Sequence, residues 1–241
     1  MNERTKARLK HWGDLVYRNT PNAISKIVYD MGRASLFKEE RQESFMHAFE
    51  HIARENIDGD YLEFGCYRGA SLIMAGKIAS RLKLRSMRFF AFDSFEGLPA
   101  SEGRLFRKGA YSCSLQAFNE YVTKAGIPAS RVVPVAGMYE NTLTEDLKRR
   151  HSMRKAALIH IDCNLYSSTQ EALRFIEDLL GVGSVLIFDD WYRHEAGVAP
   201  DNFGERKAFR EWEFRDRFRP LENPGARRVN KTFVFAGHLV S

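Results

Sequence analysis

The sequence has few cysteines and no long apolar segment, and each shortage excludes a class of protein. Only three cysteines occur in the 241 residues, at Cys66, Cys113 and Cys163. An odd and widely spaced set forms neither a disulfide framework nor a CxxC-type zinc site, so we expect three reduced thiols in a cytoplasmic protein. No stretch reaches the roughly 18 apolar residues of a membrane span, and the basic first residues lack the apolar core of a secretory signal. We therefore expect no membrane partner.

Internal repeats and low-complexity segments are also absent. The composition is that of a globular protein, with 44% hydrophobic and 28% charged residues, which excludes collagen-like and disordered chains. The 37 basic and 31 acidic residues give a net charge of +6, which raises the question of an acidic partner. Arg215, Arg217 and Arg219 are interleaved with acidic residues, a pattern typical of a solvated, salt-bridged helix. Nucleic acid is therefore not the expected partner.

Short apolar runs alternate with helical patterns from Asp58 onward. Each run is nearly continuous in apolar residues, as strands buried on both faces require. The runs lie at 61–64, 88–92, 132–136, 156–161, 185–188 and 231–236, and helices are expected at 71–82, 115–125, 169–180 and 205–214. This alternation predicts an α/β fold, a Rossmann-like doubly wound sheet that is mostly parallel.

The region before Asp58 has a different pattern. Positions 12–17 predict a short helix, and positions 39–55 predict an amphipathic helix with Phe45, Ala48, Phe49 and Ile52 on one face. His47 and His51 are four residues apart, but we favour a solvated or partly buried helix face over a metal site because no carboxylate is in register. We expect residues 1–57 to form an N-terminal helical extension that covers the substrate, and residues 58–241 to form the catalytic domain.

Ligands of an open parallel sheet bind beyond the carboxyl ends of its strands, so the residues there are the candidate site. Glu63, Gly65 and Gly69 form an E-x-G-x-x-x-G turn between the first strand and its helix, where glycines let the backbone approach a ligand. Asp93 ends the next strand, where an acid is placed to accept the hydroxyls of a ribose. Alone it is equally well an N-cap or turn residue. Together these residues have the layout of a class I S-adenosylmethionine methyltransferase.

Three carboxylates follow two other strands. Asp162 follows the run AALIHI, and Asp189 and Asp190 follow VLIF. Neighbouring strand ends lie about 5 Å apart, and three bare anions there would repel one another strongly. A divalent cation, Mg²⁺ by preference, would satisfy them through oxygen ligands. The alternative is that one or two of them are solvated loop acids.

Several segments carry a family resemblance. The strings YLEFGCYRGAS, FAFDSFEGLP, VPVAGMYENTL, LIHIDCNLYSSTQEAL, LIFDDW and GERKAF occur in this order between about Gly59 and Arg210. They resemble the macrocin, mycinamicin and novobiocin O-methyltransferases, class I enzymes that methylate sugars of antibiotics with S-adenosylmethionine and Mg²⁺. The resemblance implies a seven-stranded sheet and a homo-oligomer. The family usually has a small residue and then Asp where this chain has Cys163 and Asn164.

The resemblance also assigns roles. It implies that the methyl donor contacts the glycine turn, the end of the second strand and the end of the third. These cofactor-binding residues are Glu63, Gly65, Cys66, Tyr67, Arg68, Gly69, Asp93, Ser94, Gly137 and Met138. Asp162, Asp189 and Asp190 become the metal ligands, and Asp162 or His194 takes the proton from the acceptor hydroxyl. If Asp162 points into the site, we expect His160 to point away and to be structural.

The acceptor is the open question. We expect a sugar hydroxyl or diol, and Arg104, Arg107 and Lys108 in the loop 100–114 allow it to be anionic. The loop is expected to act as a lid, the alternative being a solvated loop. A catechol-type enzyme is an alternative if Trp191, Tyr192 and Phe203 form an aromatic slot. The cluster of basic residues at 81–88 leaves an RNA methyltransferase as a weaker alternative, and a catalytically silent interaction module is a third.

Overall fold

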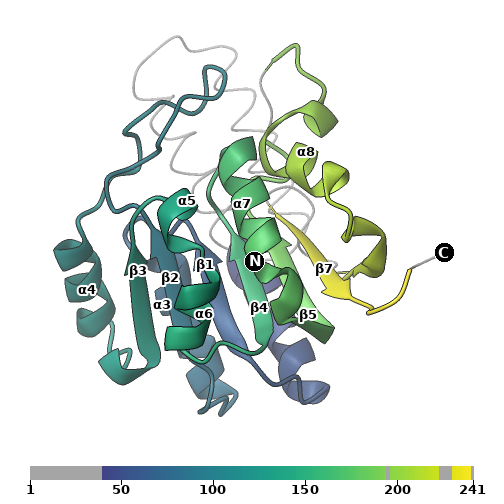
Figure 1. Ribbon diagram of the computed structural model, residues 1–241. Coiled ribbons are helices and arrows are strands. Elements are labelled where there is room, and N and C mark those ends of the chain that lie inside the picture. The colour runs from purple at the N-terminus through teal and green to yellow at the C-terminus, as the bar shows by residue number, and fades with distance from the viewer. Residues whose placement is uncertain (1–39, 194–195, 223–229, 240–241) are drawn as a thin grey trace, which may run out of the picture.

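A seven-stranded sheet runs through the centre of the molecule (Figure 1). The computed structural model describes residues 40–193, 196–222 and 230–239. The strand order is β3-β2-β1-β4-β5-β7-β6, with β1 to β5 parallel and β7 antiparallel to both β5 and β6. The strands are β1 Asp60–Phe64, β2 Phe89–Asp93, β3 Val132–Ala136, β4 Ala156–Ile161, β5 Leu180–Phe188, β6 Phe218–Pro220 and β7 Lys231–Phe235. The predicted doubly wound, mostly parallel sheet is confirmed.

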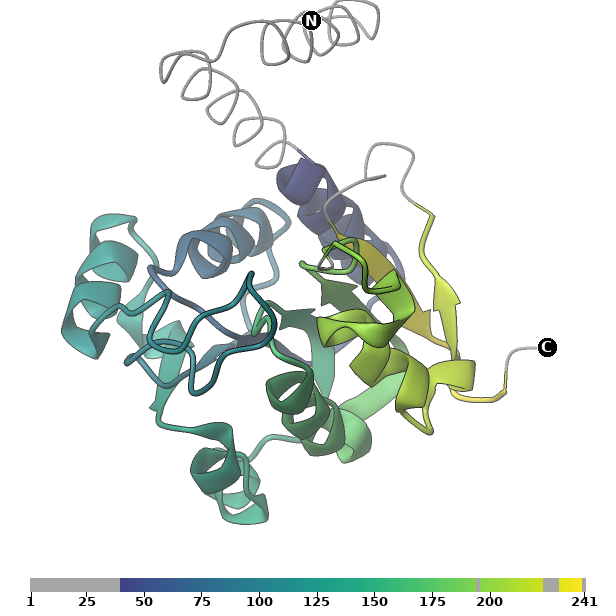
Figure 2. The same cartoon turned by 90° about the horizontal axis from the view of Figure 1, so that it is seen from above.

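Helices cover both faces of this sheet (Figure 2). One layer contains α3 (Ala70–Arg81), α4 (Leu115–Lys124) and the helix that the structure describes over residues 40–54. The other contains α5 (Tyr139–Thr142), α6 (Glu145–Arg150), α7 (Tyr166–Ile176) and α8 (Gly204–Glu211). Short 3₁₀ turns lie at Ala129–Arg131, Glu177–Leu179, Pro200–Asn202 and Arg215–Arg217. Two apolar cores result, one on each face of the sheet.

The central strands are buried because most of their side chains on both faces are apolar, Glu63 and His160 being the buried polar exceptions near the site. In β1, Leu62 and Phe64 enter the core under α7, whereas Tyr61 enters the core under α3 and the helix 40–54. The rings of Phe64 and Phe92 stack 4.7 Å apart across β1 and β2. Burying each such side chain stabilises the fold by about 2 kcal/mol. The continuous apolar runs of the sequence follow from this two-sided burial.

The helix 40–54 belongs to the same core as α3 and α4. Phe45, Ala48, Phe49 and Ile52 are all fully buried, and the rings of Phe45 and Phe49 lie 6.4 and 6.2 Å from the ring of Tyr61. The predicted amphipathic helix is therefore confirmed. The helix predicted at positions 12–17 lies outside the described residues.

Several predicted boundaries differ from the structure. The helix predicted at 169–180 begins at Tyr166 and ends at Ile176, because Leu180 already belongs to β5. The helix predicted at 205–214 ends at Glu211. β6 was not predicted, because it is a three-residue edge strand that contains a proline. Throughout the described ranges, no helix combines the length and the apolar character needed to cross a membrane.

Candidate active site

A cavity of about 700 Å³ opens at the carboxyl ends of β1, β2, β4 and β5. This volume is within the range of small-molecule sites. Its lining includes residues from the glycine turn, from the ends of β2 and β3, from the acid cluster and from the helix 40–54. These are Arg41, Gly65, Tyr67, Asp93, Ser94, Gly137, Met138, Tyr139, Asp162, Asn164, Asp189, Asp190 and Arg193, among others. The edge of the sheet predicted to bind ligands is therefore the edge that is hollowed.

The turn after β1 requires its glycines. Gly65 has φ +87°, and a Cβ atom on it would lie 2.1 Å from the carbonyl oxygen of Asp162. Gly69 caps α3 with φ +74°, and a Cβ atom there would lie 2.9 Å from the ring of Phe118. The backbone of β1 therefore passes against that of β4 without an intervening side chain.

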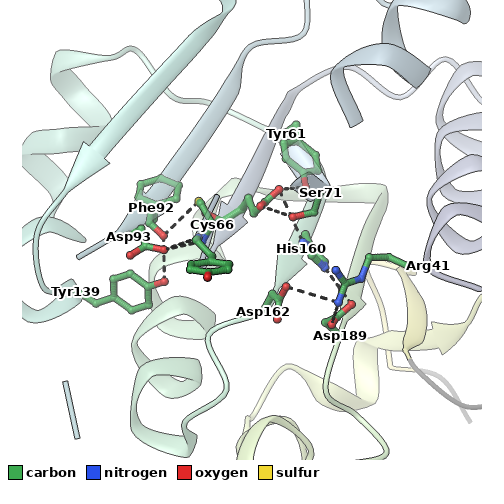
Figure 3. A network of polar contacts seen from close by, with 12 residues as sticks. Arg41, Tyr61, Cys66, Ser71, Phe92, Asp93, Tyr139, His160, Asp162 and Asp189 are labelled. Carbon is green, nitrogen blue, oxygen red and sulfur yellow. Dashed lines mark hydrogen bonds and ion pairs between the residues drawn. The ribbon is translucent and has the colours of Figure 1, made fainter. Parts of the chain in front are cut away.

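Glu63 is fully buried beneath this turn. Its Oε1 accepts a 2.6 Å hydrogen bond from the Ser71 hydroxyl, and its Oε2 accepts one from the Tyr61 hydroxyl. The bond from Ser71 joins β1 to the start of α3, and the bond from Tyr61 lies within β1 (Figure 3). Glu63 does not line the cavity, so in this structure it supports the glycine turn from below.

Asp93 organises the same turn from β2. Its Oδ2 accepts hydrogen bonds from the backbone amides of Cys66 and Tyr67, at 2.7 and 3.0 Å. Its Oδ1 accepts one from the amide of Phe95 at 2.8 Å. The side chain of Ser94 is also engaged, donating to the carbonyl of Gly97 at 2.9 Å. Both residues line the cavity, as their predicted contact with a cofactor requires.

The end of β3 supplies the next part of the wall. Gly137 has φ +135° and donates its amide to the carbonyl of Asp93 at 3.0 Å. Met138 follows, and the Tyr139 hydroxyl donates to the carbonyl of Phe92 at 3.2 Å. All three residues line the cavity. A continuous wall of close-packed backbone, with an acid at the end of the neighbouring strand, has the shape and chemistry that fit an S-adenosylmethionine molecule.

Two of the three predicted metal ligands lie side by side. The register pairs Ile161 with Phe188, so the residues that follow, Asp162 and Asp189, are neighbours. Asp189 is 4% exposed, and its Oδ1 accepts no hydrogen bond from any residue that the structure describes. Asp162 is more accessible, with 22% of its side chain exposed to the cavity.

His160 joins these two acids. One ring nitrogen of His160 and one carboxylate oxygen each of Asp162 and Asp189 lie within 4.8 Å of one another. The prediction that His160 points away from Asp162 is wrong, because residues two apart on a strand share a face. The ring is fully buried, edge-on to Phe45 at 4.9 Å between centroids.

Asp190 points elsewhere. One of its oxygens accepts a hydrogen bond from the side-chain amide of Asn164, and the other lies 3.3 Å from Nε of Arg193. Its backbone amide donates to Glu205 Oε2 at 3.0 Å. Asp190 lines the cavity, but its carboxylate is not in the group of mutually close atoms formed by His160, Asp162 and Asp189.

The pKa values of the acids shift in opposite directions, because burial and mutual repulsion raise them and neighbouring basic groups lower them. Burial, together with the charge of Asp189, raises the pKa of Asp162 well above its usual range. The same causes raise the pKa of Asp190 to about 6. Burial would also raise the pKa of Asp189, but His160 and Arg41 hold it below its ordinary value. Burial opposes the charged form of His160, yet Asp189 and Glu63 raise its pKa to about 9. Asp189 is therefore the anion that organises the cluster.

Arg41 supplies the opposite charge from outside the catalytic strands. Its Nη2 forms an ion pair with Asp189 Oδ2 and lies 4.0 Å from Asp162 Oδ2 (Figure 3). Arg41 was not predicted as a site residue, because no sequence signal links the start of an amphipathic helix to a strand end 148 residues later. Glu205 was likewise not singled out, although it lies in the quoted string GERKAF and is 1% exposed.

The donor set fits a hard divalent cation. Two carboxylates lie side by side at the cavity wall, and one buried oxygen of Asp189 lacks a hydrogen-bond donor among the described residues. Oxygen ligands of this kind are those that Mg²⁺ prefers. A cation already lies against them in the form of the Arg41 guanidinium. The site is therefore built for positive charge.

The loop 100–114 is docked over the cavity rim. Phe106 is 1% exposed and stacks on Phe203 at 5.9 Å between centroids. Glu102 accepts hydrogen bonds from the amides of Tyr166 and Gly204, at 2.6 and 3.0 Å, and so joins the loop to the first turns of α7 and α8. The alternative of a merely solvated loop does not describe this packing.

Other predicted acceptor residues lie away from the cavity. Arg104, Arg107 and Lys108 are exposed and do not line it, whereas Arg41 and Arg193 do. The aromatic slot that the catechol-type alternative would need is not formed by Trp191, Tyr192 and Phe203, because none of them lines the cavity. Trp191 instead packs against Phe209 in the core of α8.

The remaining candidates lie elsewhere. The basic residues at 81–88 lie between α3 and β2, at the end of the sheet opposite the cavity, where Arg88 pairs with Asp60 at 2.6 Å. His194, the alternative proton acceptor, lies outside the described residues.

Comparison with known proteins yields one family. A family model described as Macrocin-O-methyltransferase (TylF) matches residues 30–211. Over 203 residues the chain is 26% identical to the 8-demethyl-8-(2,3-dimethoxy-alpha-L-rhamnosyl)-tetracenomycin-C 4'-O-methyltransferase of Streptomyces olivaceus, covering 74% of this chain and 75% of that protein. It is 24% identical to the Mycinamicin III 3''-O-methyltransferase of Micromonospora griseorubida, covering 63% of this chain and 62% of that protein.

Solved structures share the fold. The O-methyltransferase NovP superposes with a TM-score of 0.67 and 20% identity, covering 82% of this chain and 80% of that one. The calicheamicin methyltransferase CalS11 superposes with a TM-score of 0.68 and 19% identity, covering 99% of this chain and 95% of that one. At such identities the likeness establishes the fold and not the substrate.

Proposed function

Because the chain belongs to the macrocin O-methyltransferase family, we propose that it transfers the methyl group of S-adenosylmethionine to a hydroxyl of a sugar or sugar-bearing natural product, with Mg²⁺ at the acid cluster. One observation carries the proposal. The glycine turn and the Asp162–Asp189 pair line the same cavity, from strands that are neighbours in the sheet. A methyl donor at the glycine turn and a hydroxyl at the acid pair would therefore bind next to each other in this cavity.

The donor side of the cavity is assigned to the turn after β1 and the ends of β2 and β3. Gly65, Tyr67 and Gly69 surround the methionine end, and Asp93 with Ser94 faces the ribose. Gly137 and Met138 lie by the adenine. The support is that most of these residues line the cavity and that Gly65 admits no side chain. Glu63, Cys66 and Arg68 belong to the turn, and Glu63 acts by holding it in place.

The acceptor side is assigned to the acids. Asp162 and Asp189 would hold Mg²⁺, and Asp190 would join them if its carboxylate turned from Asn164. When bound, the cation lowers the pKa of a hydroxyl and stabilises the developing alkoxide. The support is that carboxylate oxygens of Asp162 and Asp189 lie close together and that Asp189 is buried.

Asp162 is the proposed proton acceptor. It is the more accessible acid of the pair, and burial beside Asp189 raises its pKa, which makes it a better base. The acceptor O–H bond breaks as the proton moves to a carboxylate oxygen of Asp162. The new O–CH₃ bond forms as the S–CH₃ bond of the sulfonium breaks, and neutral S-adenosylhomocysteine leaves. The chain contributes alignment of the two reactants above all. His194 is the alternative base.

The N-terminal segment, residues 1–57, is proposed to cover the acceptor, and residues 58–241 are proposed to form the methyltransferase domain. The support is Arg41, which brings one part of this segment into the lining of the cavity.

Methyl-acceptor screening tests the proposal. The enzyme is incubated with S-adenosylmethionine, Mg²⁺ and either deoxysugar conjugates or catechols, and products are detected by mass spectrometry as a gain of one CH₂. We expect turnover of a sugar conjugate and none of a catechol. Methylation of catechols alone would assign the acceptor to the aromatic class and overturn the sugar assignment.

A second experiment tests the metal. EDTA and the variant Asp189→Asn should each lower turnover by about a hundredfold or more, the magnitude typical of lost electrostatic stabilisation in a transition state. The control is Asp146→Asn, an exposed acid of α6 that pairs with Arg149 and Arg150. Full activity of the wild type in EDTA would rule out the role of Mg²⁺ and leave the methyltransferase assignment intact.

A further inference from the structure

Arg41 is the only residue of the helix 40–54 among those that line the cavity. The rest of the buried face of the helix is mainly apolar and packs on the sheet, and its buried polar residues, Ser44 and His51, do not line the cavity. The Arg41 side chain instead extends from the first turn of the described helix to the ends of β4 and β5 (Figure 3). A charged side chain placed in this way loses hydration, and an ionic partner has to offset that loss.

The partner is the pair of acids that would hold the metal. The guanidinium pairs with Asp189 Oδ2 and its Nη2 lies 4.0 Å from Asp162 Oδ2, so it lies against oxygens of both. His160 approaches Asp189 from the other side, with Nε2 3.7 Å from Oδ1. Asp189 therefore lies between two side chains of the protein, the Arg41 guanidinium and the His160 ring.

The Arg41 contact can be broken. About 32% of its side chain is exposed, and its Nε finds no acceptor among the described residues, so it lacks a bidentate pair with Asp189. His160 is by contrast fully buried within the sheet. Of these two side chains beside Asp189, Arg41 is the one with exposed surface and room to move away.

We propose that Arg41 is an intramolecular counter-ion that competes with the divalent cation for Asp162 and Asp189 and thereby sets the metal affinity of the enzyme. This inference rests on the proposed magnesium site. A dication held by Asp162 and Asp189 would lie at contact distance from the Arg41 guanidinium, where the two like charges repel. Metal binding therefore releases Arg41, and the release is transmitted to the helix 40–54 that carries it.

Linkage fixes the sign of each effect. If bound metal weakens the contact between Arg41 and the acids by a given factor, then that contact weakens metal binding by the same factor. Removing Arg41 therefore strengthens metal binding. Without metal, removing Arg41 leaves Asp189 buried with one counter-ion fewer, which destabilises the protein. Added metal takes over the role of the missing guanidinium and restores stability.

The test measures Mn²⁺ binding, by calorimetry and by the electron paramagnetic resonance of the free ion, in the full-length protein without substrates. The variants are Arg41→Gln, which removes the charge, and Arg41→Lys, which keeps it. The matched control is Arg54→Gln on the same helix, where Arg54 is exposed and pairs with Glu55. We expect Arg41→Gln to bind Mn²⁺ about tenfold more tightly than the wild type, and Arg41→Lys and Arg54→Gln to stay near it.

Two further measurements use readouts other than the binding isotherm. Mn²⁺ should raise the melting temperature of Arg41→Gln more than that of the wild type. In the wild type alone, Mn²⁺ should also speed amide exchange at the start of the helix 40–54. Equal or weaker Mn²⁺ binding by Arg41→Gln overturns the inference and leaves the magnesium site standing. Failure of both the wild type and Arg41→Gln to bind Mn²⁺ overturns the magnesium site itself.

Discussion

His160 lies directly opposite Glu63 in the adjacent parallel strands β4 and β1, with its Nδ1 3.8 Å from Glu63 Oε2. Its other ring nitrogen is 3.7 Å from Asp189 Oδ1. Glu63 holds the glycine turn through Ser71, and Asp189 belongs to the proposed metal site. One imidazole therefore lies between the two halves of the site.

Replacing this imidazole should destabilise the fold strongly. In His160→Gln the buried carboxylates of Glu63 and Asp189 lose their shared positive partner, which we expect to lower the free energy of unfolding by about 3–5 kcal/mol. Urea unfolding measures the change. The control His238→Gln, at an exposed position, should stay within about 0.5 kcal/mol of the wild type. Equal stability of His160→Gln and wild type would contradict a charged His160.

The same residue should make stability fall with alkaline pH. Asp189 and Glu63 raise the pKa of His160 to about 9, against about 6.5 in an unfolded chain. A raised folded-state pKa contributes stability that is fully present below pH 6.5 and lost as the pH rises through 9, here about 3 kcal/mol. Unfolding of wild type and His160→Gln at pH 6, 7, 8 and 9 should show their difference shrinking. A difference that grows with pH would contradict the assignment.

The fold could be predicted because its strands are buried on both faces. Runs such as AALIHI and VLIF are almost entirely apolar, and each forms a strand that is followed by an acid of the site. The placement of Asp162 beside Asp189 needs only parallel strands in neighbouring positions. β6 escaped prediction because a three-residue edge strand has no such burial pattern.

The counter-ions of the site could not be predicted in the same way. Arg41 meets Asp189 through the tertiary packing of a helix, and its own sequence surroundings are those of any solvated helix start. The position of His160 could have been predicted, since residues two apart on a strand share a face and His160 is two residues before Asp162. The orientation of Asp190 depends on side-chain contacts with Asn164 and Arg193 that no pattern of residue types encodes.

The close approach of β1 to β4 makes Gly65 irreplaceable. In Gly65→Ala the new Cβ would meet the carbonyl of Asp162 at 2.1 Å, and φ is +87°. Gly109→Ala is the matched control, because its φ is +77° but nothing lies within 4 Å of its Cβ position. The free energy of unfolding of the control should fall by only about 1–2 kcal/mol, the cost of placing a residue with a Cβ atom in this backbone conformation.

We expect Gly65→Ala to lose several-fold more stability than this control and to bind S-adenosylmethionine at least about tenfold more weakly. Urea unfolding and calorimetry measure the two effects. Similar losses in the two variants would mean that backbone conformation, and not the contact with Asp162, requires glycine at position 65.

Glu102 should keep the loop 100–114 closed. Its carboxylate accepts the amides of Tyr166 and Gly204 at the first turns of α7 and α8, where a negative charge is favoured. Glu102→Gln keeps the size of the side chain but removes that charge. We expect the loop to open more often, with trypsin cleavage at Arg104, Arg107 and Lys108 about tenfold faster, since cleavage follows the population of the open form.

Cleavage of the loop is followed by mass spectrometry with and without S-adenosylmethionine. The control Glu96→Gln removes an exposed acid that precedes the loop. If the loop is a lid, S-adenosylmethionine slows cleavage in the wild type and in Glu96→Gln, and restores much of the protection in Glu102→Gln. If S-adenosylmethionine leaves the cleavage rate unchanged in all three proteins, the loop is a fixed part of the fold and not a lid. Equal cleavage rates for Glu102→Gln and Glu96→Gln would show that Phe106, buried against Phe203, holds the loop without Glu102.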